Sequence, residues 1–379
     1  MRILHTSDWH LGRQFHGVSL LEDQRHILGQ VIAAIREHAV DVLVIAGDIY
    51  DRAVPPTEAI ALLDDFIHEV VDGCGVPVIL IAGNHDGPVR LALAARQLAR
   101  ARVHVAGPLM ASPEPVVLHD AHGPVAFYAI PYADPPEVRD LLREEIPGHP
   151  EAMYALTNRA REHNDAGRRA VLIAHCFVDG YTGSESERPL SVGGVATVPA
   201  DCFDGFHYVA LGHLHEPQSR GAPHVRYSGS PLPYAFSEKS DKSLTLVDMD
   251  ADGACSVSTI ALVPRRQFRT VSGTLDEILR AAAEDPRRDD YILVSLQQTD
   301  AILDLMEKLR AVYPNTLRVQ RPDWMASDTR TTPTADPLKR GEMAMFGDFF
   351  RDMTGIDMDE RQSGVIADIV TALHRGGAV

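Results

Sequence analysis

The chain has 379 residues, of which 45% are hydrophobic and 23% charged, as is typical of a soluble globular protein larger than one ordinary domain. Its net charge of −17 excludes a protein that holds nucleic acid by charge alone, because phosphate neutralisation requires Lys and Arg. No apolar run approaches the roughly 20 residues that span a bilayer. No signal-peptide pattern precedes the first predicted strand, so we expect a cytoplasmic location and no membrane segment.

The first part of the chain alternates short apolar strands with amphipathic helices. Apolar residues recur with a helical period after Ser19, and Ser19 with Glu22 forms a capping-box pattern at the start of that helix. Continuous apolar strands separated by helices indicate central strands covered on both faces. The predicted elements are strand 2–6, helix 19–36, strand 40–46, helix 57–71 and strand 76–82.

After residue 102 the pattern changes, and fewer helices separate the strands. The further predicted elements are strand 125–130, helix 153–164, and strands 171–174, 208–211, 225–227 and 243–247. We therefore predict an α/β fold for residues 1–262, with two packed mixed β-sheets flanked by helices.

The remainder of the chain predicts a small α+β module and a separate C-terminal segment. Residues 263–325 have the pattern strand 268–271, helix 275–283, strand 291–296, helix 301–312 and strand 317–320. Residues 326–341 are polar and rich in Thr, Pro and Asp, which favours a linker. Residues 342–379 predict two short amphipathic helices separated by Gly355.

Five short motifs rich in Asp, Asn and His follow predicted strands. In α/β sheets, ligands bind outside the carboxyl ends of the strands, so these motifs should converge whatever their separation in sequence. A glycine before Asp48, Asn84 and His213 allows the backbone to turn sharply. The motifs are Asp8-Trp9-His10, Gly47-Asp48-Ile49-Tyr50-Asp51, Gly83-Asn84-His85-Asp86, Ala174-His175 and Gly212-His213-Leu214-His215.

These residue types suit a pair of divalent cations. Two ions about 3.5–4 Å apart can bind both an attacking hydroxide and the oxygens of a phosphate. One carboxylate must bridge them, and imidazole, carboxylate and amide groups complete each shell. We assign Asp48 as the bridge. The other ligands are Asp8, His10 and His215 for one ion and Asn84, His175 and His213 for the second.

His85 has a different predicted role. It follows the ligand Asn84, so it should lie beside the metals without binding them, where it can protonate the leaving alkoxide as a general acid. Asp51 could hydrogen-bond His85 and orient it, as carboxylates commonly orient histidines. Arg52 is placed to reach a substrate phosphate.

Each motif alone has a plainer interpretation. A single Asp-x-His or Gly-His-x-His is more often a solvated loop or a core histidine. Five such motifs, each at the end of a strand, favour a metal-dependent phosphoesterase instead.

Together the five motifs resemble those of the calcineurin-like metallophosphoesterase superfamily. Its members range from protein phosphatases to nucleases, so the motifs imply the reaction class and not the substrate. Further segments are similar to one branch, the SbcD family of nuclease subunits, closely over residues 1–245 and in outline beyond. They are Leu11-Gly12-Arg13, Glu22-Asp23-Gln24, His213-Leu214-His215-Glu216-Pro217-Gln218, Tyr227-Ser228-Gly229-Ser230-Pro231 and Phe236-Ser237-Glu238-Lys239.

This resemblance implies a manganese-dependent DNA nuclease, with 3′ to 5′ exonuclease activity on double strands and endonuclease activity on single strands and hairpins, acting in DNA repair and recombination. It implies a homodimer within a heterotetramer, a capping domain at 263–325, and a C-terminal segment that docks on the ATPase SbcC. That partner would supply much of the DNA-binding surface, with Arg13 and Arg52 as local contacts. The implied anchors for the ATPase are Phe346, Phe349, Phe350 and Ile356. From their spacing alone, these residues could equally fold back on their own core.

Two other functions fit part of the sequence. A small-molecule phosphodiesterase or phosphomonoesterase of the same superfamily would have a similar catalytic core, but it would not need residues 267–379. A non-catalytic scaffold would have lost metal ligands, and none of the expected ligands is missing here.

Overall fold

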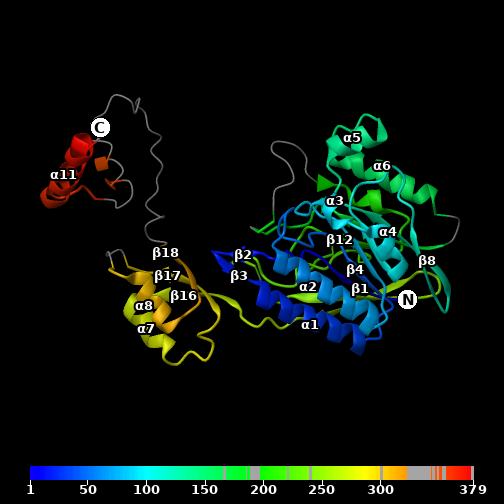
Figure 1. Ribbon diagram of the computed structural model, residues 1–379, viewed down its shortest axis with the longest axis horizontal. Coiled ribbons are helices and arrows are strands. Elements are labelled where there is room, and N and C mark those ends of the chain that lie inside the picture. Colours follow the sequence, from blue (N-terminus) through cyan, green and yellow to red (C-terminus); the bar gives the residue numbers. More distant parts are fainter. Residues whose placement is uncertain are drawn as a thin grey trace. The chain divides into compact units, whose positions relative to one another are not determined.

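The structure, a computed structural model, contains two compact units, Met1–Phe268 and Arg269–Val379 (Figure 1). It describes residues 1–164, 168–184, 186–187, 197–219, 222–238, 241–298, 302–321 and 356–376, together with Met343, Phe346, Gly347, Phe350 and Arg351. Among these residues, no helix is both long enough and apolar enough to cross a membrane.

The first unit is built on two sheets, and the first sheet has six strands in the order β15-β14-β1-β4-β5-β6. Neighbouring strands from β1 to β6 run parallel, whereas β14 pairs antiparallel with both β1 and β15. The strands are β1 (Arg2–Thr6), β4 (Val42–Ile45), β5 (Val78–Ile81), β6 (Val103–Ala106), β14 (Ser243–Met249) and β15 (Cys255–Ala261).

The second sheet has the order β13-β12-β9-β8-β7 and is parallel except at β7, which pairs antiparallel with β8. Its strands are β7 (Val116–Asp120), β8 (Gly123–Ile130), β9 (Arg169–His175), β12 (Tyr208–Gly212) and β13 (Val225–Tyr227). This unit also contains two small two-stranded sheets. They pair β2 (Gln14–Phe15) with β3 (Val18–Ser19), and β10 (Phe177–Val178) with β11 (Thr197–Val198).

The core of this unit lies between the two sheets. Side chains alternate across a strand, so each sheet sends half of its residues inward. Ile3, Val44 and Ile79 of the first sheet share one buried cluster with Phe127 and Ile173 of the second. This packing aligns the carboxyl ends of strands from both sheets.

Helices cover the outer faces of the sandwich. The helix α1 (Leu21–Glu37) buries Ile27, Leu28, Val31 and Ile35, which share one helical face, and it contacts α2 (Thr57–His68). Over the second sheet, Met153 and Leu156 of α6 (His149–Glu162) share a buried cluster with Tyr128 and Leu172. Shorter helices are the π-helix η1 (Glu69–Gly73), α3 (Pro88–Leu91), α4 (Ala95–Leu98), α5 (Pro135–Leu142) and the 3₁₀ turns η2 (Ala99–Ala101) and η3 (Ala200–Phe203).

The predicted mixed α/β architecture of two packed sheets flanked by helices is confirmed, with two local corrections. The expected capping box at α1 is wrong, because the N-cap is the buried Leu20 and no side chain caps the helix. Ser19 instead pairs with Gln14 in the β2–β3 hairpin. The helix α5 and the strands β6, β7 and β15 were not predicted. The strands β7 and β15 are edge strands, which expose many of their residues and so carry no continuous apolar run.

The second unit contains a three-stranded sheet, β16-β17-β18, with two helices. Ile278 of α7 and Leu309 of α8 share a core with Ile292 and Val294 of the central strand. Thr274 and Glu277 form a capping box at the start of α7. The elements are β16 (Phe268–Gly273), α7 (Leu275–Ala282), β17 (Tyr291–Leu296), α8 (Leu305–Val312), β18 (Thr316–Gln320) and α11 (Glu360–Gly376).

This order of elements is the one expected for residues 268–320, although α8 begins later than predicted. The proposed linker at 326–341 and the predicted helix break at Gly355 lie outside the described residues.

Candidate active site

The five motifs meet at the carboxyl ends of strands from both sheets. Asp8 and His10 follow β1, Asp48 follows β4 and Asn84 follows β5. In the second sheet, His175 is the last residue of β9, and His213 and His215 follow β12. The structure therefore brings together all seven proposed ligands, although they are spread over more than half of the sequence.

Short distances join these side chains into one cluster. His10 Nε2 lies 3.2 Å from His215 Nε2 and 3.7 Å from Asp48 Oδ2. On the other side, His175 Nε2 lies 3.5 Å from Asp48 Oδ2 and 3.0 Å from Asn84 Oδ1. Asp48 thus stands between the two groups, as a bridging ligand must.

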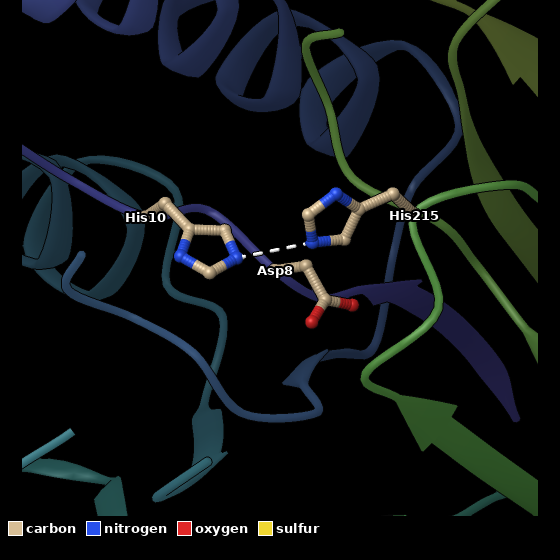
Figure 2. Close-up of side chains that lie close together, drawn as sticks. All are labelled: Asp8, His10 and His215. Carbon is tan, nitrogen blue, oxygen red and sulfur yellow. Dashed lines mark hydrogen bonds between the residues drawn. The ribbon is translucent and has the colours of Figure 1, made fainter. Parts of the chain in front are cut away.

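The group proposed for one metal converges on a single point. One ligand atom from each of Asp8, His10 and His215 lies within 4.8 Å of the others, and all three residues are buried (Figure 2). Asp8, Asp48 and His175 form a second such group, which shares Asp8 with the first. His213 belongs to the same cluster, since its ring centroid lies 5.4 Å from that of His175.

The backbone at the ligands adopts a conformation that non-glycine residues rarely take. The φ angles are +55° at Asp8, +47° at His10, +50° at Asp48 and +105° at His213. Such left-handed residues cost of order 1–3 kcal/mol each and concentrate at functional sites. The strand ends are therefore bent to aim these side chains inward.

The glycines before the ligands serve two different purposes. Gly47 has a positive φ of 92°, as expected for a sharp turn. Gly83 and Gly212 do not. A Cβ on Gly83 would lie 2.2 Å from Asp48 Oδ1, and a Cβ on Gly212 would lie 1.8 Å from the backbone oxygen of Ala46. These two glycines are needed because the loops approach each other closely.

The hydrogen bonds of the cluster indicate a cation. His175 Nδ1 must donate to the backbone oxygen of Ala46, 2.9 Å away, which leaves a lone pair on Nε2. That lone pair faces the oxygens of Asn84 and Asp48, so acceptors face acceptors. His10 Nδ1 is also buried without a hydrogen-bond partner.

The pKa shifts of the cluster also favour a bound cation. Burial, followed by the neighbouring charge of Asp48, raises the pKa of Asp8 well above its usual value. Burial and the nearby His215 lower the pKa of His10 well below its usual value, and burial does the same to His213. Neutral imidazoles beside carboxylates and an amide oxygen are a donor set suited to divalent transition metals. The residues present therefore fit a metal centre.

Asp86, for which the sequence suggested no role, ties two of the metal loops together. Its carboxylate accepts hydrogen bonds from the backbone nitrogens of Ile49 (3.0 Å), Tyr50 (2.9 Å) and Gly83 (2.9 Å). Gln24, on α1, braces the loop of His10 by donating to its backbone oxygen at 2.7 Å. Neither role could be found from sequence, because each depends on backbone groups from a distant segment.

His85 lies beside the cluster, with its ring centroid 4.6 Å from that of His10. The expectation that the Asp51 carboxylate orients His85 is wrong. His85 Nδ1 donates to the backbone oxygen of Asp51 at 2.9 Å. The carboxylate of Asp51 instead contacts Arg13 Nη1 at 3.2 Å, and it lies 3.7 Å from His10 Nδ1.

A cavity of about 500 Å³ opens beside His85. Arg13 and Arg52, the two proposed substrate contacts, both line it together with Asn84. Arg13 is held in place, since its guanidinium carbon lies 4.8 Å from the centre of the Tyr234 ring and its Nη1 contacts Asp51.

The proposed partner anchors are described only in part. Phe346 is 40% exposed, Ile356 is 65% exposed and Phe350 is half-buried. Phe349 lies outside the described residues.

Comparisons with known proteins agree with this architecture. The family model for calcineurin-like phosphoesterase matches residues 1–217, and the model described as type 5 capsule protein repressor C-terminal domain matches residues 264–354. The first match defines the class of protein as a metal-dependent phosphoesterase.

Similar proteins narrow that class. The D subunit of nuclease SbcCD from Staphylococcus saprophyticus subsp. saprophyticus is 33% identical over 380 residues, covering 100% of each chain. This chain therefore belongs to the SbcD family of calcineurin-like phosphoesterases. A remote match among solved structures is the crystal structure of TT1561 of Thermus thermophilus. It has 13% identity and a TM-score of 0.41 and covers 68% of this chain and 98% of that one.

Proposed function

We propose that this chain is the nuclease subunit of an SbcCD-type complex. In this proposal it hydrolyses phosphodiester bonds in DNA with two divalent metal ions, and both ions are Mn²⁺ in the cell. The observation that carries this proposal is the buried cluster around Asp48, where the lone pair of His175 Nε2 faces the oxygens of Asp48 and Asn84 and where His10 Nε2 lies 3.7 Å from Asp48 Oδ2. The full-length similarity to a subunit of nuclease SbcCD supports DNA as the substrate.

In this proposal Asp8, His10 and His215 would hold one metal, Asn84, His175 and His213 would hold the other, and Asp48 would be a ligand of both. Bound metals supply Lewis acidity and a hydroxide at neutral pH for attack on phosphorus. The backbone nitrogen of His85 donates to Asp48 Oδ1 at 2.8 Å, which fixes the bridge.

His85 is the proposed general acid. Because its Nδ1 donates to the backbone oxygen of Asp51, Nε2 is the nitrogen free to carry and release a proton. The His85 side chain lines the cavity, where a leaving alkoxide would emerge. Arg13 and Arg52 line the same cavity and would contact phosphates on either side of the scissile bond.

The acidic net charge of −17 agrees with a nuclease that works within a complex. We propose that an SbcC-like ATPase supplies most of the DNA-binding surface and binds residues 342–379 through Phe346, Phe349, Phe350 and Ile356. Residues 1–262 form the nuclease domain, 263–325 the capping domain and 326–341 the linker in this proposal.

We further propose a homodimer within a heterotetramer, acting in the cytoplasm. Large apolar side chains are exposed near the active-site loops and on the segment that follows them, which supports self-association through this domain. Val54 is 62% exposed, Val89 79% and Leu93 76%.

The test uses Mn²⁺-loaded protein together with its ATPase partner. Four substrates are added in separate assays: linear duplex DNA, a DNA hairpin, a small phosphodiester and a phosphomonoester. We expect 3′ to 5′ degradation of the duplex and endonucleolytic opening of the hairpin. Release of phosphate from the monoester without cleavage of DNA would favour a small-molecule phosphoesterase. Absence of bound metal in the purified protein would favour a scaffold.

A further inference from the structure

The backbone of His215 is held from both sides. Its nitrogen donates to Glu187 Oε1 at 2.8 Å. Its oxygen accepts from the backbone nitrogen of Ser230 at 3.1 Å and from Lys242 Nζ at 2.8 Å. These contacts come from three separate segments of the chain, so the position of His215 does not depend on its own loop alone.

The imidazole of His215 is held at Nδ1. This nitrogen lies 2.6 Å from Ser186 Oγ and 3.3 Å from Glu238 Oε1. Ser186 Oγ donates in turn to Glu238 Oε1. Because the carboxylate only accepts, the chain of donors runs from His215 Nδ1–H through the serine hydroxyl to Glu238. Nε2 then carries the lone pair, and it is the atom that faces His10 and Asp8 (Figure 2).

Glu238, at the end of this series of hydrogen bonds, also forms an ion pair that is almost completely buried. Lys242 Nζ is 2.6 Å from Glu238 Oε2, and the two side chains are 2% and 0% exposed. The other acceptors of the ammonium group are the backbone oxygen of His215 and Ser230 Oγ, at 3.0 Å. Its three N–H groups thus have three partners, as a buried ammonium group requires.

We propose that Glu238 and Lys242 are positioning residues for one metal of the proposed centre, and that they fix His215 in the Nδ1–H tautomer with Nε2 aimed at the metal. The proposal rests on the metal site of the proposed function. Glu238 acts through the imidazole, and Lys242 acts by compensating the carboxylate and by holding the backbone of His215. Outer partners of this kind commonly change metal affinity by about 10–100-fold.

The test must separate positioning from folding, because removing one member of a buried ion pair leaves an uncompensated charge. Glu238→Gln/Lys242→Met removes both charges at similar volume, and Ser186→Ala removes only the hydroxyl link. Glu162→Gln, an exposed carboxylate on α6, is the matched control.

Two readouts are needed. Calorimetric titration of the metal-free protein with Mn²⁺ gives the affinity, and ¹⁵N NMR of labelled histidine rings gives the tautomer of His215, assigned by its absence in His215→Gln. We expect the Nδ1–H tautomer in the wild type and in the control. In the double variant we expect a mixed tautomer, one Mn²⁺ bound about 10–100-fold more weakly, and hydrolysis that recovers at saturating Mn²⁺.

An Nε2–H tautomer in the metal-free wild type would overturn the proposal, whatever the variants do. It would also be overturned if the folded double variant and Ser186→Ala both kept wild-type Mn²⁺ affinity and tautomer. If the wild type bound Mn²⁺ but cleaved no DNA, the proposed function would fail while the tautomer result still stood.

Discussion

His85 differs from the proposed histidine ligands because its imidazole is half-buried at the cavity wall, whereas theirs are buried. Its Nδ1 is held by the backbone oxygen of Asp51. Only Nε2 is left for proton transfer. The contact that orients the ring comes from the backbone of Asp51, so it survives any substitution of that side chain. The roles of His85 and Asp51 therefore separate by experiment.

We predict that His85→Ala lowers the kcat of phosphodiester hydrolysis by about 10²–10⁴-fold while Mn²⁺ remains bound, because a positioned general acid contributes that much. Asp51→Ala should cost less than His85→Ala, since the backbone oxygen that holds His85 is retained. Kinetics at saturating Mn²⁺ measure both variants. An unchanged kcat in His85→Ala with the metals bound would contradict the assignment of the acid.

At the scale of elements, the site depends on how closely the strand ends approach one another. The elements that carry the motifs could be predicted, because runs such as Val42–Ile45 and Val78–Ile81 are continuously apolar. The close approach itself could not be predicted, because it depends on the packing of two sheets. For the same reason the sequence suggested no role for Asp86 or Lys242, whose partners come from segments distant in sequence.

We predict that Gly212→Ala disturbs the metal centre and destabilises the protein by about 1–3 kcal/mol, the usual cost of overpacking. Its Cβ would lie 1.8 Å from the backbone oxygen of Ala46 and 2.8 Å from His175 Nδ1. Thermal unfolding and Mn²⁺ titration measure the two effects.

Gly29→Ala is the matched control, because beyond the neighbouring backbone of α1 no atom lies within 4 Å of its Cβ position, and Gly29 is exposed. This change should stabilise the protein by about 0.5–1 kcal/mol. Equal stability of the two variants would show that the loops do not need the close approach.

For the whole molecule, a buried histidine outside the metal centre makes stability depend on pH. His5 lies between the two sheets, with Nδ1 2.9 Å from the hydroxyl of Tyr208 and Nε2 3.2 Å from the backbone oxygen of Leu211. Burial, and then the charge of Arg226, lowers the pKa of His5 to about 3 from 6.5. Between pH 6.5 and about 3, His5 is therefore protonated in the unfolded chain but remains neutral in the folded protein.

We predict that the free energy of unfolding of the metal-free wild type falls more steeply than that of His5→Gln as the pH decreases from 6.5 toward 3. The difference in slope should approach about 1.4 kcal/mol per pH unit. Denaturant titrations of both proteins at several pH values measure it. Parallel curves would mean that His5 titrates in the folded protein as it does in the unfolded chain.

All proposed metal ligands lie in the first compact unit, Met1–Phe268, whereas the proposed partner-binding segment belongs to the second. Deleting residues 341–379 should abolish association with the ATPase and leave Mn²⁺-dependent cleavage of a small phosphodiester intact, because all proposed ligands lie between Asp8 and His215. Co-purification and a hydrolysis assay measure these two results. Loss of both properties would contradict a separate role for the segment.

Anomalous diffraction from Mn²⁺-soaked crystals would locate the metals of a two-metal centre bridged by Asp48. We expect two manganese peaks about 3.5–4 Å apart. One should lie beside Asp8, His10 and His215 and the other beside Asn84, His175 and His213, with Asp48 in contact with both. A single peak, or two peaks that do not share Asp48, would contradict it.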